Sequence, residues 1–252
     1  MKIRTSIAAG LVVLLLTIAS IFIIPALKAS SSQNLTQTEI PVVIKPLKIG
    51  NDIVPVDIQC EKVFTTKPNT LDRFTCILVN KTNKSISASS VRYSIIVDSN
   101  GKEEEDSRLD IAIPYIHPDL LEIKKPIQPE GKLFIAPPGP FVESDSVIKR
   151  LELEPVYIEF SDGTTAGVGG KSAEMIANVR EGAAKYKNSL YQEYLKRGKS
   201  VKAILQLLED DAPLDSETLN FLQQTGAKSY RNSLRKKYEK DGLASINKVL
   251  NQ

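Results

Sequence analysis

The sequence has few of the side chains that most often perform catalysis or bind metals. It has one histidine, two cysteines and no tryptophan in 252 residues. A zinc site or a Ser-His-Asp arrangement would depend on His117, which disfavours both. His117 stands in the loop-like segment Tyr115–Asp119, and the sequence has no Gly-x-Ser-x-Gly elbow. We therefore expect a protein that is not an enzyme and that uses no metal or cofactor.

Basic residues are not in excess beyond the N-terminus. Lys2, Arg4 and Lys28 flank an N-terminal apolar run, and 33 basic residues minus these three leave 30, against 30 acidic residues. A balanced chain lacks the net basic charge typical of nucleic-acid binding, so no nucleic-acid partner is expected. With 42% hydrophobic and 25% charged residues, the composition is that of a globular protein.

The apolar run, Ile7–Leu27, contains no charge and follows a basic start. It is long enough to span a membrane, which takes about 20 residues, whereas the apolar core of a signal peptide has roughly 7–15. A small-residue cleavage site at Ala29 keeps the second interpretation open, so residues 1–29 are a signal peptide or a signal anchor. Lys2 and Arg4 predict an extracytoplasmic fold, attached to the membrane by this helix or secreted.

Residues 30–49 open with Ser, Gln and Thr, and they are expected to form a flexible linker. In residues 50–170, apolar and polar residues alternate with a period of two between regular turn signals, which predicts an antiparallel β-sandwich domain. The expected strands lie at or near residues 56–60, 74–78, 91–97, 109–113, 120–123, 133–136 and 147–160, with a last one at 164–168. The apolar parity changes at Pro155, which indicates a β-bulge, and Asp162-Gly163 suits a hairpin turn.

The two cysteines fit one hairpin of this domain. Cys60 and Cys76 are symmetric about Pro68, so a turn at residues 67–70 would place them opposite each other. Both have the apolar parity of their strands, and exported proteins fold in an oxidising compartment. We expect a disulfide, with a pair of buried free thiols as the alternative.

The stretch Phe74–Ile86, FTCILVNKTNKSI, is an apolar strand running into an Asn-rich turn before the next strand. It resembles the strand–turn–strand opening of bacterial extracellular Ig-like domains of the CARDB type. The resemblance covers about residues 50–170 and implies a sandwich fold with a binding or spacer role. It implies no functional residue, and the chain lacks the Trp and the cysteine spacing of an antibody-type core.

Residues 171–252 have a helical pattern instead. A first helix is expected from an N-cap at Ser172 to Gly198, and a second over residues 201–208. A third is expected from about 215 to Gly226, a fourth over 227–241, and a short last one around 246–250.

Two segments of this helical tail repeat each other with a period of 44 residues. Residues 182–198 and 226–242 are identical at nine of seventeen positions, which predicts a duplicated helix–Gly–helix unit. Each copy has a row of two tyrosines and a leucine at steps of four, Tyr186, Leu190, Tyr194 and Tyr230, Leu234, Tyr238. These rows are either core positions of a helical bundle or a partner face for an envelope protein or a second copy.

Three further segments suggest chemistry weakly. Thr165–Ser172 resembles a phosphate-binding P-loop, but Thr165 stands where that motif needs Gly or Ala, so no nucleotide is expected. A flexible joint or another anion site at the helix start are the alternatives. Glu103–Asp106 could bind Ca²⁺ or a basic partner, or simply be solvated. Glu152 and Glu154 share a strand face without a recognisable cleft, so no glycosidase is predicted.

The sequence predicts a non-enzymatic extracytoplasmic binding or scaffold protein, tethered or secreted. In the alternative, the helical tail is the protein-interaction module and the sandwich is its spacer. A hydrolase with an unrecognised site is the third and most distant option.

Overall fold

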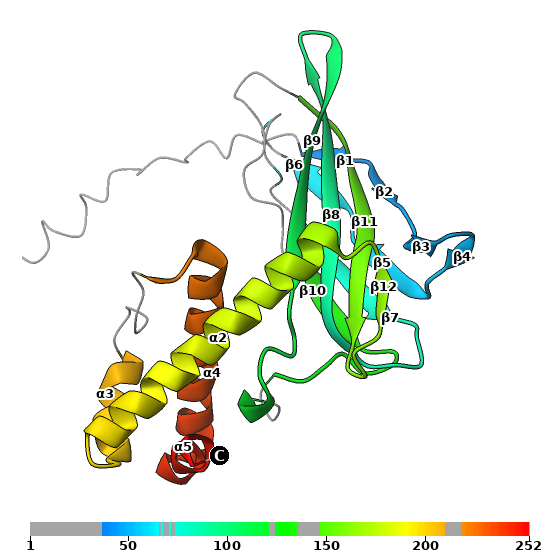
Figure 1. Cartoon of the computed structure of the whole chain (residues 1–252). Helices are drawn as coiled ribbons and strands as arrows, with labels where there is room; N and C mark the ends of the chain where they lie inside the picture. Colours follow the sequence, from blue (N-terminus) through cyan, green and yellow to red (C-terminus); the bar gives the residue numbers. More distant parts are fainter. Residues whose placement is uncertain are drawn as a thin grey trace, which may run out of the picture. The chain divides into compact units, whose positions relative to one another are not determined.

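The computed structural model describes residues 37–65, 67, 71, 74–120, 124–135, 147–209 and 218–251. The leader over residues 1–29 lies outside the described residues, as does most of the turn expected at 67–70. Among the described helices, none combines the length and apolar character that a membrane crossing requires. The described chain forms a β-rich region of several sheets, followed by four C-terminal helices (Figure 1).

The largest sheet is built around two long strands. Its order is β12-β11-β8-β9, and β2 adds in parallel to β11. The strands are β12 (Thr165–Gly167), β11 (Val147–Phe160), β8 (Ile86–Ser99), β9 (Lys102–Ala112) and β2 (Val42–Ile44). A three-stranded antiparallel sheet has the order β10-β7-β5. Its strands are β10 (Lys132–Ile135), β7 (Cys76–Asn80) and β5 (Val56–Cys60). Two short pairs complete the region, β1 (Thr38–Ile40) with β6 (Val63–Thr65) and β3 (Lys48–Ile49) with β4 (Asp52–Ile53).

One hydrophobic core joins the two larger sheets, because alternate residues of both point into it. In β11, Leu151 and Leu153 are buried before Pro155, and Ile158 and Phe160 after it. The strand register shifts between Pro155 and Tyr157, so the predicted bulge is confirmed. The extra residue reverses the inward parity and keeps both ends of this 14-residue strand in the core.

The disulfide between Cys60 and Cys76 is also confirmed. The two residues are direct antiparallel partners in β5 and β7, with Cα atoms 4.1 Å apart. Cys76 is fully buried, whereas Cys60 is partly exposed. A disulfide favours an oxidising, extracytoplasmic environment.

One expectation for the β region is wrong. Residues 38–49 were expected within a flexible linker but form three short strands, and they bury Ile40 and Leu47 in the core. The expected linker begins with polar residues, but its later part contains β-branched residues that favour strands. Residues 38–40 pair with β6, and residues 42–44 pair with β11. Of the strand expected at 120–123, residues 121–123 lie outside the described residues. Leu120 ends the short 3₁₀ helix η1 (Pro118–Leu120), which buries it against the helices.

The helices are α2 (Gly170–Lys196), α3 (Val201–Glu209), α4 (Phe221–Asp241) and α5 (Leu243–Leu250). α4 runs unbroken through Gly226, so the helix boundary expected there is wrong. It starts at Asn220, whose side chain accepts from the Gln223 backbone N–H in a capping box. α2 starts earlier than expected, with Gly169 rather than Ser172 at the N-cap.

Candidate functional site

The six residues proposed as a partner face do not form an accessible surface. Tyr186, Leu190, Tyr194, Tyr230 and Leu234 are at most 3% exposed and pack inside the helical cluster. Tyr238 is partly buried against the same cluster. The apolar rows of α2 and α4 face each other, so each covers the other. The structure therefore corrects the partner-face interpretation, and these side chains hold the helices together.

The repeat gives this helix pair reciprocal contacts. A Cβ on Gly182 would overlap the backbone of Gln223, and a Cβ on Gly226 would overlap the backbone of Val179. Gln223 lies 44 residues after Val179, and Gly226 lies 44 residues after Gly182, so each contact is the image of the other. The equivalent tyrosines Tyr186 and Tyr230 also meet, with ring centroids 6.1 Å apart. The two long helices thus pack as a symmetric dimer interface would, within one chain.

Three polar contacts along one side of α2 attach the helices to the β region. The first is at the start of the helix, where the Ser172 and Ser90 hydroxyls are 3.0 Å apart and buried. The small residues Ser90 and Ala88 allow this close approach on β8, and Ile176 packs there against Ala88 and Tyr157. Position 172 is followed at intervals of eight and seven residues by the other two contacts, which is the spacing of one helix face.

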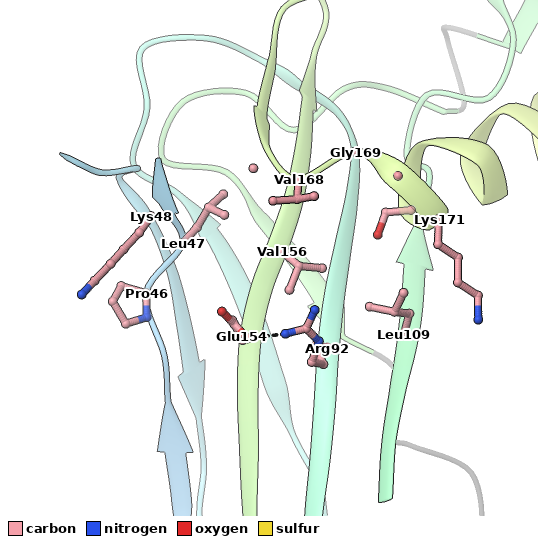
Figure 2. Close-up of a pocket in the computed structure, with 13 residues that line it drawn as sticks. Pro46, Leu47, Lys48, Arg92, Leu109, Glu154, Val156, Val168, Gly169 and Lys171 are labelled. Atoms are coloured by element: carbon pink, nitrogen blue, oxygen red, sulfur yellow. Dashed lines mark hydrogen bonds and ion pairs between the residues drawn. The ribbon is translucent and has the colours of Figure 1, made fainter. Parts of the chain in front are cut away.

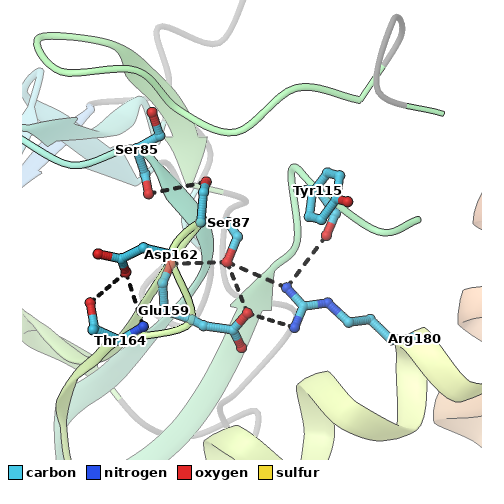
Figure 3. Close-up of polar contacts among 8 residues, drawn as sticks. Ser85, Ser87, Tyr115, Glu159, Asp162, Thr164 and Arg180 are labelled. Carbon is cyan, nitrogen blue, oxygen red and sulfur yellow. Dashed lines mark hydrogen bonds and ion pairs between the residues drawn. The ribbon is translucent and has the colours of Figure 1, made fainter. Parts of the chain in front are cut away.

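The second contact is the Arg180–Glu159 ion pair, with Nη1 and Oε1 2.7 Å apart (Figure 3). Ser87 supports it by donating from Oγ to the same carboxylate oxygen at 2.9 Å. Arg180 also donates to the backbone carbonyl of Tyr115, at 3.5 Å. Both charged side chains are about three-quarters buried, and their partners come from β8, β11 and the loop after β9. This arrangement positions the helix on the sheet.

The third contact is centred on Asp119, whose side chain is 8% exposed. Lys187 lies 2.7 Å from its Oδ2 atom, and the Tyr230 hydroxyl donates to it at 3.0 Å. His117 lies 3.3 Å from the same carboxylate, and its ring meets that of Tyr230 edge-on. Burial lowers the pKa of His117, Asp119 raises it and Lys187 lowers it further. The only histidine therefore joins this loop to α4, and burial favours its neutral form.

The P-loop-like segment Thr165–Ser172 folds as β12, a short connection and the start of α2. An open cleft of about 340 Å³ lies beside it. Lys48 and Lys171 lie on opposite sides of this cleft, with the Arg92–Glu154 ion pair between them (Figure 2). A Cβ at Gly167 would overlap the Val156 carbonyl, so close packing explains this glycine. The basic side chains do not converge as a phosphate site requires.

Carboxylates on the β region pair with neighbouring basic residues. Glu152 accepts from Lys45 and Arg150, and the Lys45 hydrogen bond is the largest cause of its lowered pKa. Glu103 lies 3.5 Å from Arg150, and Asp106 lies 3.3 Å from Arg108. Among the described residues, no three His, Cys, Asp or Glu side chains are grouped so that they could hold a metal ion.

Seven lysines line two neighbouring hollows along α4 and α5. The first hollow, of about 330 Å³, is lined by Lys124, Lys228 and Lys236 together with Thr225, Ser229, Asn232 and Ser233. The second, of about 730 Å³, is lined by Lys125, Lys240 and Lys248 with Lys237, Asp241, Ala244 and Ser245. We call these two hollows the lysine groove. The sequence does not reveal this groove, because Lys124 and Lys125 are far from the helical lysines in the chain and lie beside them only in the folded protein.

The lysine groove differs from the β surface in how its charges are balanced. None of Lys124, Lys125, Lys228, Lys236, Lys240 and Lys248 takes part in an ion pair between described residues. Among the described residues that line the two hollows, Asp241 is the one carboxylate. Nearby, Glu239 lies 3.5 Å from Arg235 on α4. The groove is thus a concave, cationic surface built by the helical region.

No family model, curated protein or solved structure matches this chain. The chemistry of the site therefore has to follow from its geometry and charge.

Proposed function

We propose that this chain is a non-enzymatic extracytoplasmic binding or scaffold protein, tethered or exported through its leader. In this proposal the β region is an Ig-like sandwich of the CARDB type that presents the helices. The shared core of the two larger sheets supports the sandwich, and the Cys60–Cys76 disulfide supports export.

The attachment of α2 to the sheet is the observation that supports a scaffold most directly. Ser172, Arg180 and Lys187 each contact the β region or the loop after β9, and Ile176 adds apolar packing. Such contacts oppose rotation of the helices about the connection at residues 168–169. The helical region is therefore held in one orientation, as a presenting scaffold requires.

The first experiment is the intact mass of the native protein, before and after reduction and alkylation. We expect two alkyl labels only after reduction. A mass that starts near Ser30 means a secreted protein, and a mass that retains residues 1–29 means a tethered one. If both cysteines react under denaturing conditions without reduction, export is wrong.

The lysine groove favours a second candidate, in which the helical tail is the interaction module and the sandwich is a spacer. Crosslinking in the native envelope separates the two. If charge reversal at Lys228, Lys236 and Lys240 removes the crosslinked partner, the helical tail binds it. If reversal at the β-surface residues Lys62, Lys81 and Lys132 does so instead, the β region takes part and is more than a spacer.

A further inference from the structure

We infer that the lysine groove binds a linear polymer carrying phosphodiester groups outside the membrane. This inference deepens the proposed binding function by naming the partner class, and it rests on that function. Among the described residues, six of the lysines that line the groove take part in no ion pair. The helical region as a whole carries a surplus of cations, since residues 172–252 have 14 basic and 10 acidic side chains.

The groove extends in one direction, along the axis of α4. Lys228, Lys236 and Lys240 are separated by eight and four residues, so the row winds by about 120° around the helix from Lys228 to Lys240. Their twelve-residue span covers about 18 Å at the rise of an α-helix. Lys124 and Lys125 border the two hollows, and Lys248 extends the row onto α5. Several successive charges of one strand can therefore meet lysines together.

The concave shape favours a thin strand over a flat bilayer. Lys237 in the second hollow is only 4% exposed, and Ser233 in the first is 3% exposed. These buried side chains form the floor of two open hollows, along which a narrow chain can lie. The described residues that line them include no aromatic ring on which nucleobases could stack, which disfavours single-stranded nucleic acid.

The kind of cation favours phosphodiesters over carboxylates. The lining supplies lysine and no arginine, and a lysine ammonium acts as a compact point charge. Bidentate recognition of carboxylates and phosphates is typical of arginine, whereas lysine binds phosphate as a point charge. The exposed Asn232 amide and the Ser229 hydroxyl add neutral donors beside the lysines. A polymer with one negative charge per repeat and oxygen acceptors between the charges matches these lysines and neutral donors.

The test is binding of fluorescently labelled poly(glycerol phosphate) to the oxidised full chain in an uncharged detergent. We expect saturable binding that weakens about tenfold or more between ~50 and ~200 mM salt, because several ion contacts are replaced by counterions. The variant Lys228→Glu/Lys236→Glu/Lys240→Glu should lose at least about tenfold in affinity. Lys228→Gln/Lys236→Gln/Lys240→Gln, which only neutralises the row, should lose less.

The matched control is Lys132→Glu/Lys171→Glu/Lys202→Glu, which changes net charge equally at exposed sites outside the groove. Its affinity should stay within about twofold of wild type. Circular dichroism checks each fold, and the Gln variant decides if the Glu variant does not fold. Equal loss in the control overturns the groove.

Tighter binding of poly(glutamate), of single-stranded DNA or of phosphatidylglycerol vesicles overturns the phosphodiester polymer as the partner. These measurements do not depend on cellular location. Failure of export would therefore appear only in the alkylation experiment, and failure of the groove only here.

Discussion

The β region and the helical region of this chain establish their cores by different means. The β core joins strands that are distant in sequence, and the Cys60–Cys76 disulfide fixes one of its strand pairs. The helical core rests on two similar helices whose backbones meet at Gly182 and Gly226. Replacing a side chain in the β core alters packing locally, whereas adding one at the helix contact separates the helices. The helical region should therefore be the more sensitive to small substitutions.

The largest expected effect is Gly226→Ala. Its Cβ would overlap the Val179 backbone, so α2 and α4 must move apart, and we expect a loss of more than about 3 kcal/mol of unfolding free energy. Gly169→Ala is the control, because the nearest atom to its Cβ would be 3.4 Å away. Hydrogen exchange should show lost protection in the helices first. Equal stability of both variants in urea would contradict the close helix contact.

The second effect is on the β core. Removing the disulfide with Cys60→Ala/Cys76→Ala should cost about 3 kcal/mol, since the bond closes a loop of about 15 residues. Hydrogen exchange should increase in β5 and β7 and change little in α4. Reduced wild-type protein is the control, since it keeps both sulfurs. If reduction leaves the denaturation midpoint unchanged, the disulfide adds no stability.

The third change uncouples the two regions. Arg180→Leu removes the partner of Glu159. Because both side chains are about a quarter exposed to solvent, we expect the unfolding free energy to fall by only about 1 kcal/mol. A double-mutant cycle with Glu159→Gln measures the coupling, and Lys185→Leu, an exposed lysine of α2 paired with Glu181, is the control. A coupling energy near zero would show that this contact does not attach the helix.

The smallest expected effect is a pH dependence of the unfolding free energy, caused by His117. Burial lowers the pKa of folded His117, so the unfolded chain binds more protons once the pH falls below about 6.5. Stability should therefore decrease as the pH falls through that value, and His117→Asn should reduce the slope. Urea denaturation at several pH values measures it. The same slope in both proteins would mean that another group is responsible.

The sequence predicts the β region best where side-chain alternation is regular. The bulge at Pro155 follows from the change of apolar parity, and the cysteine pair follows from parity together with the symmetry of Cys60 and Cys76 about Pro68. Strands β1 and β2 are not evident from the sequence because their pairing partners, β6 and β11, are far away in the chain. Gly226 resembles a helix end in the sequence because a glycine inside a helix usually weakens it. The Val179 backbone, which requires a glycine there, lies in a distant segment of the chain.

The candidate site was less predictable than the fold. The tyrosine rows were recognised as equivalent, but their spacing suits a buried interface and an exposed face equally well. The lysine groove combines residues 124–125 with residues 228–248, and no local pattern links them. The folded arrangement was needed to show that these charges share one surface.

The reciprocal glycine contact has a consequence for how such a chain can evolve. If two identical helices met in this way in a homodimer, every substitution would appear in both. Because α2 and α4 belong to one chain, each can be substituted independently of the other. Arg180, which attaches α2 to the sheet, corresponds to Gln224 in α4, and Lys228 and Lys236 correspond to Ala184 and Gln192 in α2. One copy makes the contacts that hold the helices to the sheet, and the other supplies the helical lysines of the first hollow.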